Sequence, residues 1–200
     1  QSYQLLDSGH GQKLEQFGQN RIIRPDINCI WSPKLSDNEW NKADAIYTSK
    51  GWEITRSFKD PWTMTYTLQN SDIGVNKLTF ALKCSSTSKN IGIFPEQASN
   101  WAWIVKTIQN STTKPNVLNL FGYTGAATLA AAAAGAEVCH VDSSKSTIAA
   151  ARYNQELSHL TEAPIRWIVD DCADFVAREI KRGVKYDALI MDPPAFGRDQ

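Results

Sequence analysis

The sequence predicts an α/β protein in which a small β-rich domain precedes a domain built on a parallel sheet. Two observations support this prediction. Short alternating segments and turn residues dominate the first 90 residues. From Pro115 onward, four apolar strand segments alternate with three helical segments, which is the pattern of right-handed βαβ crossovers. We therefore expect one domain over residues 1–90 and a second over residues 91–200.

The first domain is predicted to hold five strands and one short helix. Alternating and β-branched residues predict the strands at 3–6, 13–17, 21–24, 63–68 and 77–83. Ser36-Asp-Asn-Glu39 matches a capping box, in which serine and glutamate side chains satisfy backbone N–H groups at a helix start. A helix is therefore expected to begin here.

The second domain is predicted to open with a helix over 97–109. Strands are then expected at 117–121, 137–142, 165–169 and 186–191, and helices at 125–134, from 143 or 144, and at 172–182. Gly135 and Gly183 follow two of these helices, where glycine readily adopts the left-handed conformation that ends a helix. The last strand is a continuous apolar run and is expected to be buried.

Composition indicates a globular chain with a real core, because 42% of its 200 residues are hydrophobic. No stretch approaches the roughly 18 apolar residues of a membrane span, and the start lacks a signal-peptide pattern, so we expect a cytoplasmic protein. The four cysteines are scattered without metal-ligand spacing, so free thiols and no metal site are expected. The 21 basic and 21 acidic residues balance, which leaves only a localised basic patch to attract nucleic acid.

Polar residues follow the predicted parallel strands at the edge where ligands bind in such sheets. After the first strand, Asn119-Leu-Phe-Gly122-Tyr-Thr124-Gly125 is a glycine-bearing turn that opens a helix, whose free N–H groups could face a polar ligand. It lacks Gly-x-Gly-x-x-Gly, so a dinucleotide is poorly supported. A purely structural turn is the alternative.

Acidic residues follow the second and third strands. Asp142 lies about 20 residues after the turn, where a carboxylate can accept hydrogen bonds from ribose hydroxyls. Asp170 and Asp171 follow the third strand, where a carboxylate can accept from an adenine amino group. The alternative for both positions is helix capping, because aspartate is a favoured N-cap residue.

The fourth strand ends in Asp192-Pro-Pro-Ala-Phe196. Asp192 can accept from an N–H group of a substrate. Pro193 and Pro194 lack N–H groups and have fixed φ, so they stiffen the backbone. Phe196 can stack on a planar base. The alternative is a rigid surface turn, and Arg198 is either a phosphate contact or a solvated side chain.

Together these segments resemble the class I S-adenosylmethionine-dependent methyltransferases. The chain is most similar to the bacterial large-subunit ribosomal RNA methyltransferases that act on cytosine C5 or guanine N7, and to their uncharacterised relatives. The resemblance rests on the 117–125 turn, Val141-Asp142, Asp170-Asp171, Met191-Asp-Pro-Pro-Ala-Phe196 and Gly92-Ile-Phe94-Pro-Glu96-Gln97, and in the first half on Leu6-Asp-Ser-Gly9 and Lys13-Leu-Glu-Gln-Phe-Gly18.

The resemblance implies a Rossmann-like class I methyltransferase domain preceded by a small β-rich α+β domain. The sheet of this class normally has seven strands and this sequence supplies four. We therefore expect an incomplete parallel sheet and a fragment of a longer chain, with an unpaired edge that favours aggregation.

The resemblance also implies that S-adenosyl-L-methionine is the cofactor, and it assigns roles to individual residues. The methionine part would lie on Asn119, Gly122, Thr124 and Gly125, the ribose on Asp142, the adenine on Asp171 and the Cys172 backbone, the cofactor cover on Phe94 and Gln97, and the acceptor on Asp192, Pro193, Pro194 and Phe196.

The implied function is methyl transfer to a base of RNA, most similar to ribosomal RNA modification in the large subunit. Cytosine C5 chemistry needs a thiolate, and the 192–196 motif contains no cysteine, so direct nitrogen methylation stays open. Other open alternatives are a protein, DNA or small-molecule acceptor, a non-catalytic RNA-binding or assembly protein on the same fold, and a nicotinamide-dependent oxidoreductase.

Overall fold

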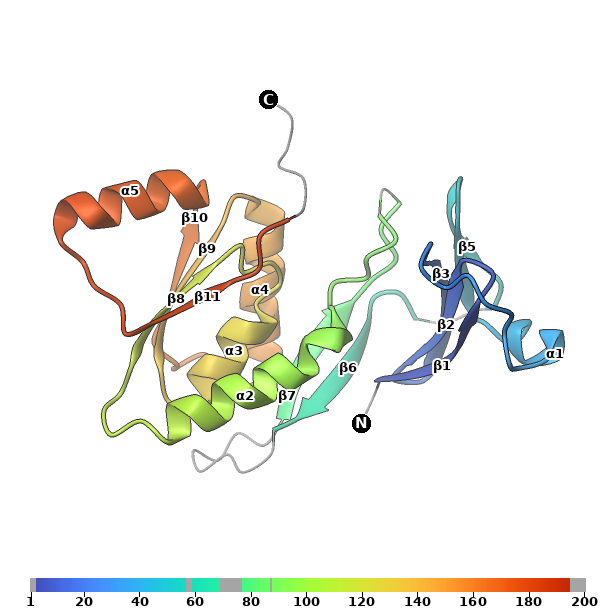
Figure 1. Ribbon diagram of the computed structural model, residues 1–200, viewed down its shortest axis with the longest axis horizontal. Coiled ribbons are helices and arrows are strands. Elements are labelled where there is room, and N and C mark those ends of the chain that lie inside the picture. Colours follow the sequence, from blue (N-terminus) through green and yellow to red (C-terminus); the bar gives the residue numbers. More distant parts are fainter. Residues whose placement is uncertain (1–2, 57–58, 69–76, 87, 195–200) are drawn as a thin grey trace. The chain divides into compact units, whose positions relative to one another are not determined.

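The computed structural model describes residues 3–56, 59–68, 77–86 and 88–194 (Figure 1). Contacts divide the chain into two compact units. Unit 1 comprises Gln1–Tyr66 and Phe80–Pro95, and unit 2 comprises Thr67–Thr79 and Glu96–Gln200.

Unit 1 is built on a five-stranded sheet in sequence order. Its strands are β1 (Tyr3–Gly9), β2 (Gln12–Phe17), β3 (Asn20–Pro25), β4 (Ala45–Thr48) and β5 (Gly51–Ile54). Neighbouring strands are antiparallel except for β3 and β4, which pair in parallel. Leu14, Ile23 and Ala43 form a core cluster with Leu6, Trp40 and Ile46 packed against it. The β-rich character expected for this part of the chain is confirmed.

The short helix α1 (Asp37–Trp40) lies where expected, but the capping box does not form. Ser36 is the N-cap residue and its side chain makes no capping hydrogen bond. Glu39 instead forms ion pairs with Arg21 and Lys42. Its carboxylate is therefore drawn away from the helix start.

Two further strands, β6 (Trp62–Thr67) and β7 (Lys77–Leu82), form a two-stranded sheet and contribute residues to both units. They agree with the strands predicted at 63–68 and 77–83 to within one residue at each end.

Unit 2 contains a four-stranded sheet in the order β10-β9-β8-β11, and all of its pairings are parallel. Its elements in chain order are η1 (Pro95–Gln97, whose first residue belongs to unit 1), α2 (Ala98–Gln109), β8 (Asn116–Leu120), α3 (Ala126–Ala133), β9 (Glu137–Asp142), α4 (Lys145–Leu157), β10 (Ile165–Val169), α5 (Cys172–Arg182) and β11 (Ala188–Met191). The predicted alternation of strands and helices is confirmed.

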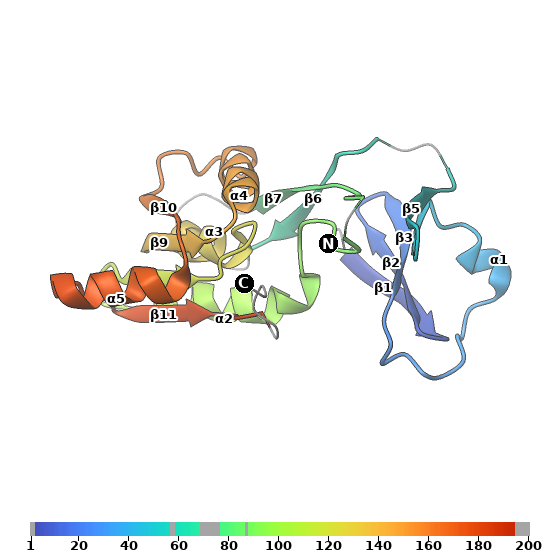
Figure 2. The same ribbon diagram turned by 90° about the horizontal axis from the view of Figure 1, so that it is seen from above.

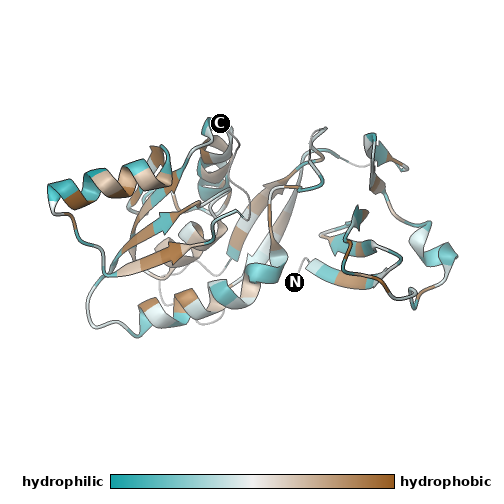
Figure 3. Ribbon diagram, turned by 45° about the horizontal axis from the view of Figure 1, so that its top comes forward, coloured by the Kyte–Doolittle hydropathy of each residue, from teal (hydrophilic) through white to brown (hydrophobic). Residues whose placement is uncertain are grey.

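Helices cover the two faces of this sheet. Figures 1 and 2 show α5 on one face and α2, α3 and α4 on the other. Under α5 lies a cluster of buried residues, Leu118, Leu120, Cys139, Val141, Cys172 and Phe175. Under α3, alanines 130, 131 and 133 are fully buried, and such small side chains let a helix approach a sheet closely. The strands are largely hydrophobic, and hydrophilic and hydrophobic residues alternate along α5 (Figure 3).

The expectation that the last strand is buried is wrong for the described residues. Leu189 is 57% exposed and Met191 is 55% exposed. The reason is topological, because among the described strands β11 pairs only with β8 and occupies an edge of the sheet.

All four cysteines are free. Over the described ranges no helix has the length and hydrophobicity needed to cross a membrane.

Candidate functional site

The candidate site lies at the carboxyl edge of the unit 2 sheet. The chain progresses from β8 to β10 in one direction and then returns to the other side of β8 to form β11. The switch point is therefore between β8 and β11, where ligands bind in open α/β sheets. The loops that follow these strands carry the polar residues predicted from the sequence.

The turn between β8 and α3, residues 121–125, is conformationally unusual. Phe121, Tyr123 and Gly125 have φ of 55°, 50° and 88°. Two non-glycine residues in this left-handed region make the turn strained, and strained backbone persists only where its surroundings fix it. At Gly125 a glycine is required, because an added Cβ would lie 3.0 Å from the Ala151 Cβ in addition to the unfavourable φ.

Hydrogen bonds hold this β8–α3 turn to β9 and to the start of α5. Gly125 N–H closes the turn on the Gly122 carbonyl at 3.0 Å. Three further N–H groups are bound from outside the turn: Phe121 N–H donates to the Cys172 Sγ at 3.3 Å, Gly122 N–H to the Val141 carbonyl at 3.1 Å, and Tyr123 N–H to the Asp142 Oδ2 at 3.0 Å. The turn is thus fixed to the end of β9 and to the first residue of α5.

The amino end of α3 has no side-chain cap from its own N-cap residue. That residue is Gly125, which makes no capping hydrogen bond. The neighbouring Thr124 is 7% exposed, and its carbonyl accepts from the Asn154 Nδ2 at 3.0 Å. Uncapped N–H groups at a helix start attract carboxylates and other anions. The arrangement fits the carboxylate end of an amino-acid ligand.

A buried polar network lies beneath the turn. The Asn119 Nδ2 donates to the Thr128 Oγ1 at 2.8 Å, and the same hydroxyl lies 2.8 Å from the His140 Nδ1. Asn119 is 2% exposed, and Thr128 and His140 are fully buried. Asn119 is thus near the turn, as predicted, but its side chain supports the turn from below.

Asp142 joins the turn to the next helix. Its Oδ1 accepts from the Ser144 N–H at 2.9 Å, while its Oδ2 holds Tyr123. Ser144, not Asp142, is the N-cap residue of α4, and its hydroxyl accepts from the Thr147 N–H. Ser144 therefore caps α4, and the alternative that Asp142 caps this helix is not realised.

The residues after β10 are largely engaged within α5. Asp171 is its N-cap residue, and the Oδ1 accepts from the N–H groups of Ala173 and Asp174 at 2.8 and 3.1 Å. Asp170 forms an ion pair with Arg178. Asp171 therefore caps α5, which is the alternative stated for it from the sequence. Both capping contacts are made by Oδ1 and neither by Oδ2.

Cys172 is 4% exposed at the start of α5. Burial raises the pKa of its thiol, with a smaller contribution from the neighbouring carboxylates Asp142 and Asp171 and an opposing effect of the Phe121 N–H. The thiol is therefore a packing and hydrogen-bonding group.

Two predicted residues far apart in the sequence meet at this edge. The Gln97 Nε2 donates to the Asp192 Oδ2 at 3.2 Å, and the Gln97 Oε1 accepts from the Asn100 Nδ2 at 2.5 Å. Pro193 and Pro194 follow Asp192 and are exposed. Phe196 and Arg198 lie outside the described residues, and Phe94 belongs to unit 1.

Sequence reasoning missed the residues that support the turn rather than line it. They are Thr128, His140, Asn154 and Trp167. His140 was detectable as a polar residue within the apolar strand Val-Cys-His-Val.

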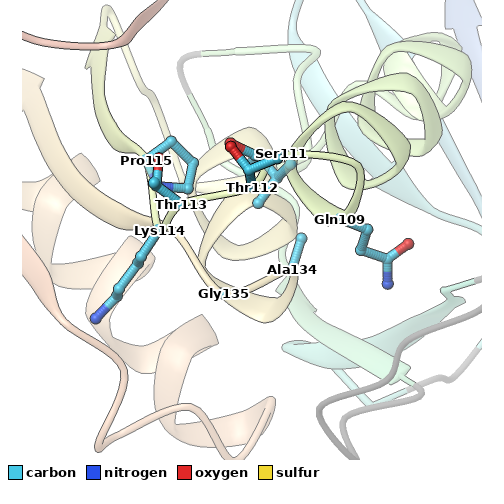
Figure 4. A pocket seen from close by; sticks show the side chains of 9 residues that line it. Gln109, Ser111, Thr112, Thr113, Lys114, Pro115, Ala134 and Gly135 are labelled. Carbon is cyan, nitrogen blue, oxygen red and sulfur yellow. The ribbon is translucent and has the colours of Figure 1, made fainter.

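A cavity of about 310 Å³ lies at the opposite end of β8, before the strand begins. Gln109, residues 111–115, Ala134 and Gly135 line it (Figure 4). It is separate from the carboxyl edge and shares none of the predicted site residues.

Comparison with known proteins identifies the family. The family model for S-adenosylmethionine-dependent methyltransferases matches residues 55–200. The chain therefore belongs to the S-adenosylmethionine-dependent methyltransferase family, and the resemblance stated from its motifs is confirmed.

Three relatives show the extent of the similarity. A crystal structure of an S-adenosylmethionine-dependent methyltransferase from Agrobacterium tumefaciens is 40% identical with a TM-score of 0.90, over 99% of this chain and 62% of that one. The ribosomal RNA large subunit methyltransferase I of Salmonella arizonae is 38% identical over 40% of this chain and 20% of its own length. The protein of the same description from Serratia proteamaculans is 35% identical over 44% and 22%. The matched part thus spans about a fifth of these two curated relatives.

Proposed function

We propose that the protein is an S-adenosyl-L-methionine-dependent methyltransferase that modifies a base of RNA, namely ribosomal RNA of the large subunit. The observation that carries the proposal is the uncapped amino end of α3 beside Asp142 at the switch point of a parallel sheet. Family membership supports the reaction type. The RNA acceptor is supported by relatives described as ribosomal RNA large subunit methyltransferases. A cytoplasmic location is part of the same proposal.

The chain offers a distinct group for each part of the cofactor. The α3 amino end with Gly122, Thr124 and Gly125 would hold the methionine part, with Asn119 supporting from below. Asp142 would accept from the ribose hydroxyls, since a carboxylate oxygen can accept a further hydrogen bond. The carboxylate of Asp171 and the backbone of Cys172 would hold the adenine. Gln97 would cover the cofactor.

The acceptor side is proposed to be the segment from Asp192 to Phe196. When bound, S-adenosyl-L-methionine supplies an electrophilic methyl group on its sulfonium sulfur. The residues then act mainly by positioning, since aligned reactants avoid an entropic barrier of about 7 to 11 kcal/mol in the best model systems. Asp192 would accept from a base N–H while the Gln97 Nε2 donates to its Oδ2. Pro193 and Pro194 would keep the backbone stiff, and Phe196 would stack on the base.

Cys172 is not proposed as a nucleophile. Its thiol is buried and its pKa is raised, whereas a nucleophilic cysteine needs an exposed thiolate. Cys172 would therefore not supply the thiolate that cytosine C5 transfer needs, and direct nitrogen methylation stays open.

The test is methyl transfer from labelled S-adenosyl-L-methionine to total RNA, followed by nucleoside mass spectrometry to identify the modified atom. Calorimetric titration with S-adenosyl-L-methionine and with NAD runs beside it. Label in one RNA nucleoside, absent with Asp192→Asn, is expected. Tight NAD binding without methyl-donor binding would refute the proposal, and donor binding without transfer to RNA, protein or DNA would favour a non-catalytic protein on this fold.

A further inference from the structure

The imidazole of His140 is the one polar group of the network under the β8–α3 turn to which no role has yet been given. It lies in β9 between Cys139 and Val141, and its side chain is fully buried. Burial lowers the pKa of His140 to about 4, against a smaller opposing effect of the Tyr123 backbone. The ring is therefore neutral at neutral pH and acts through shape and hydrogen bonding rather than charge.

One edge of the ring is tied to the strand that leads into the turn. The Nδ1 lies 2.8 Å from the Thr128 Oγ1, which also accepts from the Asn119 Nδ2 at 2.8 Å. A single hydroxyl thus links β8, α3 and β9. This link fixes the ring relative to the start and the end of the β8–α3 turn.

The same ring also supports the turn itself. A Cβ added to Gly122 would lie 2.3 Å from the His140 Cε1, 2.5 Å from its Nδ1 and 2.9 Å from its Nε2, so the Gly122 backbone rests directly on the imidazole. The Trp167 ring lies 4.7 Å away, centroid to centroid, which restricts movement of the imidazole. The ring is therefore a fixed spacer under Gly122.

The Nε2 atom is buried and has no hydrogen-bond partner among the described residues. Leaving such an atom unpaired is unfavourable, and an apolar side chain would avoid it. The ring is nevertheless held in place by its hydrogen bond to Thr128 and by its contact with Gly122.

We propose that His140 is a positioning residue for the cofactor. Its ring fixes the position of the Gly122 backbone and thereby shapes the turn that receives the methionine part of S-adenosyl-L-methionine. This inference rests on the proposed function. The effect of His140 should be confined to the methionine end of the ligand, because the nucleoside end is assigned to Asp142 and Asp171.

The experiment compares S-adenosylhomocysteine with adenosine, which lacks the amino-acid part. Affinities of the folded protein for both ligands are measured by calorimetry, well below the thermal transition, for His140→Asn and His140→Gln. Asparagine is long enough to reach Thr128 but too short to support Gly122, whereas glutamine can place an amide near the Nε2 position. We expect His140→Asn to weaken S-adenosylhomocysteine binding about tenfold, the equivalent of one lost hydrogen bond, with adenosine affinity unchanged. His140→Gln should restore much of the loss.

Ser158→Ala provides the matched control. The Ser158 hydroxyl is buried in unit 2, accepts from the Thr79 N–H at 2.9 Å and donates to the Thr79 carbonyl at 3.2 Å, so its removal also deletes buried hydrogen bonds. It should leave the ratio of the two affinities unchanged. An equal loss for both ligands in His140→Asn, or no loss, would overturn the inference alone. Failure of the unaltered protein to bind either ligand would overturn the proposed function, and this inference with it.

Discussion

Replacing Gly122 by alanine should destabilise the protein through one identifiable clash. The added Cβ would lie 2.3 and 2.5 Å from the His140 Cε1 and Nδ1, whereas carbon contacts are normally about 3.5 to 4.0 Å. The overlap exceeds 1 Å, and the ring is held by Thr128 and packed against Trp167. We therefore expect the upper end of the overpacking range, about 3 kcal/mol. For a chain of this size that loss lowers Tm by about 6 to 12 °C.

A double-mutant cycle with His140→Ser isolates the clash. Serine removes the ring, so the alanine methyl group enters vacated space. Urea unfolding should then show Gly122→Ala/His140→Ser to be about 2 kcal/mol more stable than the sum of the single changes. Gly183→Ala is the control, because its φ of +67° causes strain while no atom lies within 4 Å of the added Cβ. Additivity of the Gly122 and His140 changes would refute this account of the turn.

Three further predictions concern other groups of unit 2. The pKa of His140 falls from its ordinary 6.5 to about 4 in the folded chain. The free energy of unfolding is therefore unaffected by this group above pH 6.5 and decreases by about 3 kcal/mol as pH falls toward 4, because the unfolded state then binds the proton more readily. Urea unfolding from pH 4 to 8 should show this dependence, reduced in His140→Gln. Asp142→Ala should weaken donor binding, whereas Asp192→Ala should mainly lower turnover, and equal losses of donor affinity in calorimetry would contradict that division. Tyr186→Phe removes the hydroxyl that donates to the buried Glu179 carboxylate at 2.7 Å and should lower the free energy of unfolding by about 1.5 to 3 kcal/mol. An unchanged thermal unfolding transition would contradict this prediction.

The parallel sheet was predictable because its strands are mainly apolar and alternate with helices that have clear start and stop residues. β9, β10 and α5 begin and end at the predicted residues. The strands β4 and β5 were missed because each has only four residues and neither shows a clear alternation. Their pairing depends on contacts with β3, which no local pattern encodes.

The candidate site was predictable where function depends on residues that follow strands. Gln97 and Asp192 were both selected from the sequence, and their hydrogen bond joins positions 95 residues apart. The supporting network was not predictable, because Asn119, Thr128 and His140 meet only after β8 and β9 pair. The chemical environment of a buried histidine arises from the fold.

The β8–α3 turn has a consequence for the thermodynamics of ligand binding. Its left-handed residues and bound N–H groups mean that the conformational entropy of this segment is lost during folding. A ligand that binds there meets a preorganised surface, so its affinity is not reduced by the ordering of a flexible loop. Ligand affinity and the local stability of unit 2 should therefore vary together, even for substitutions that never touch the ligand.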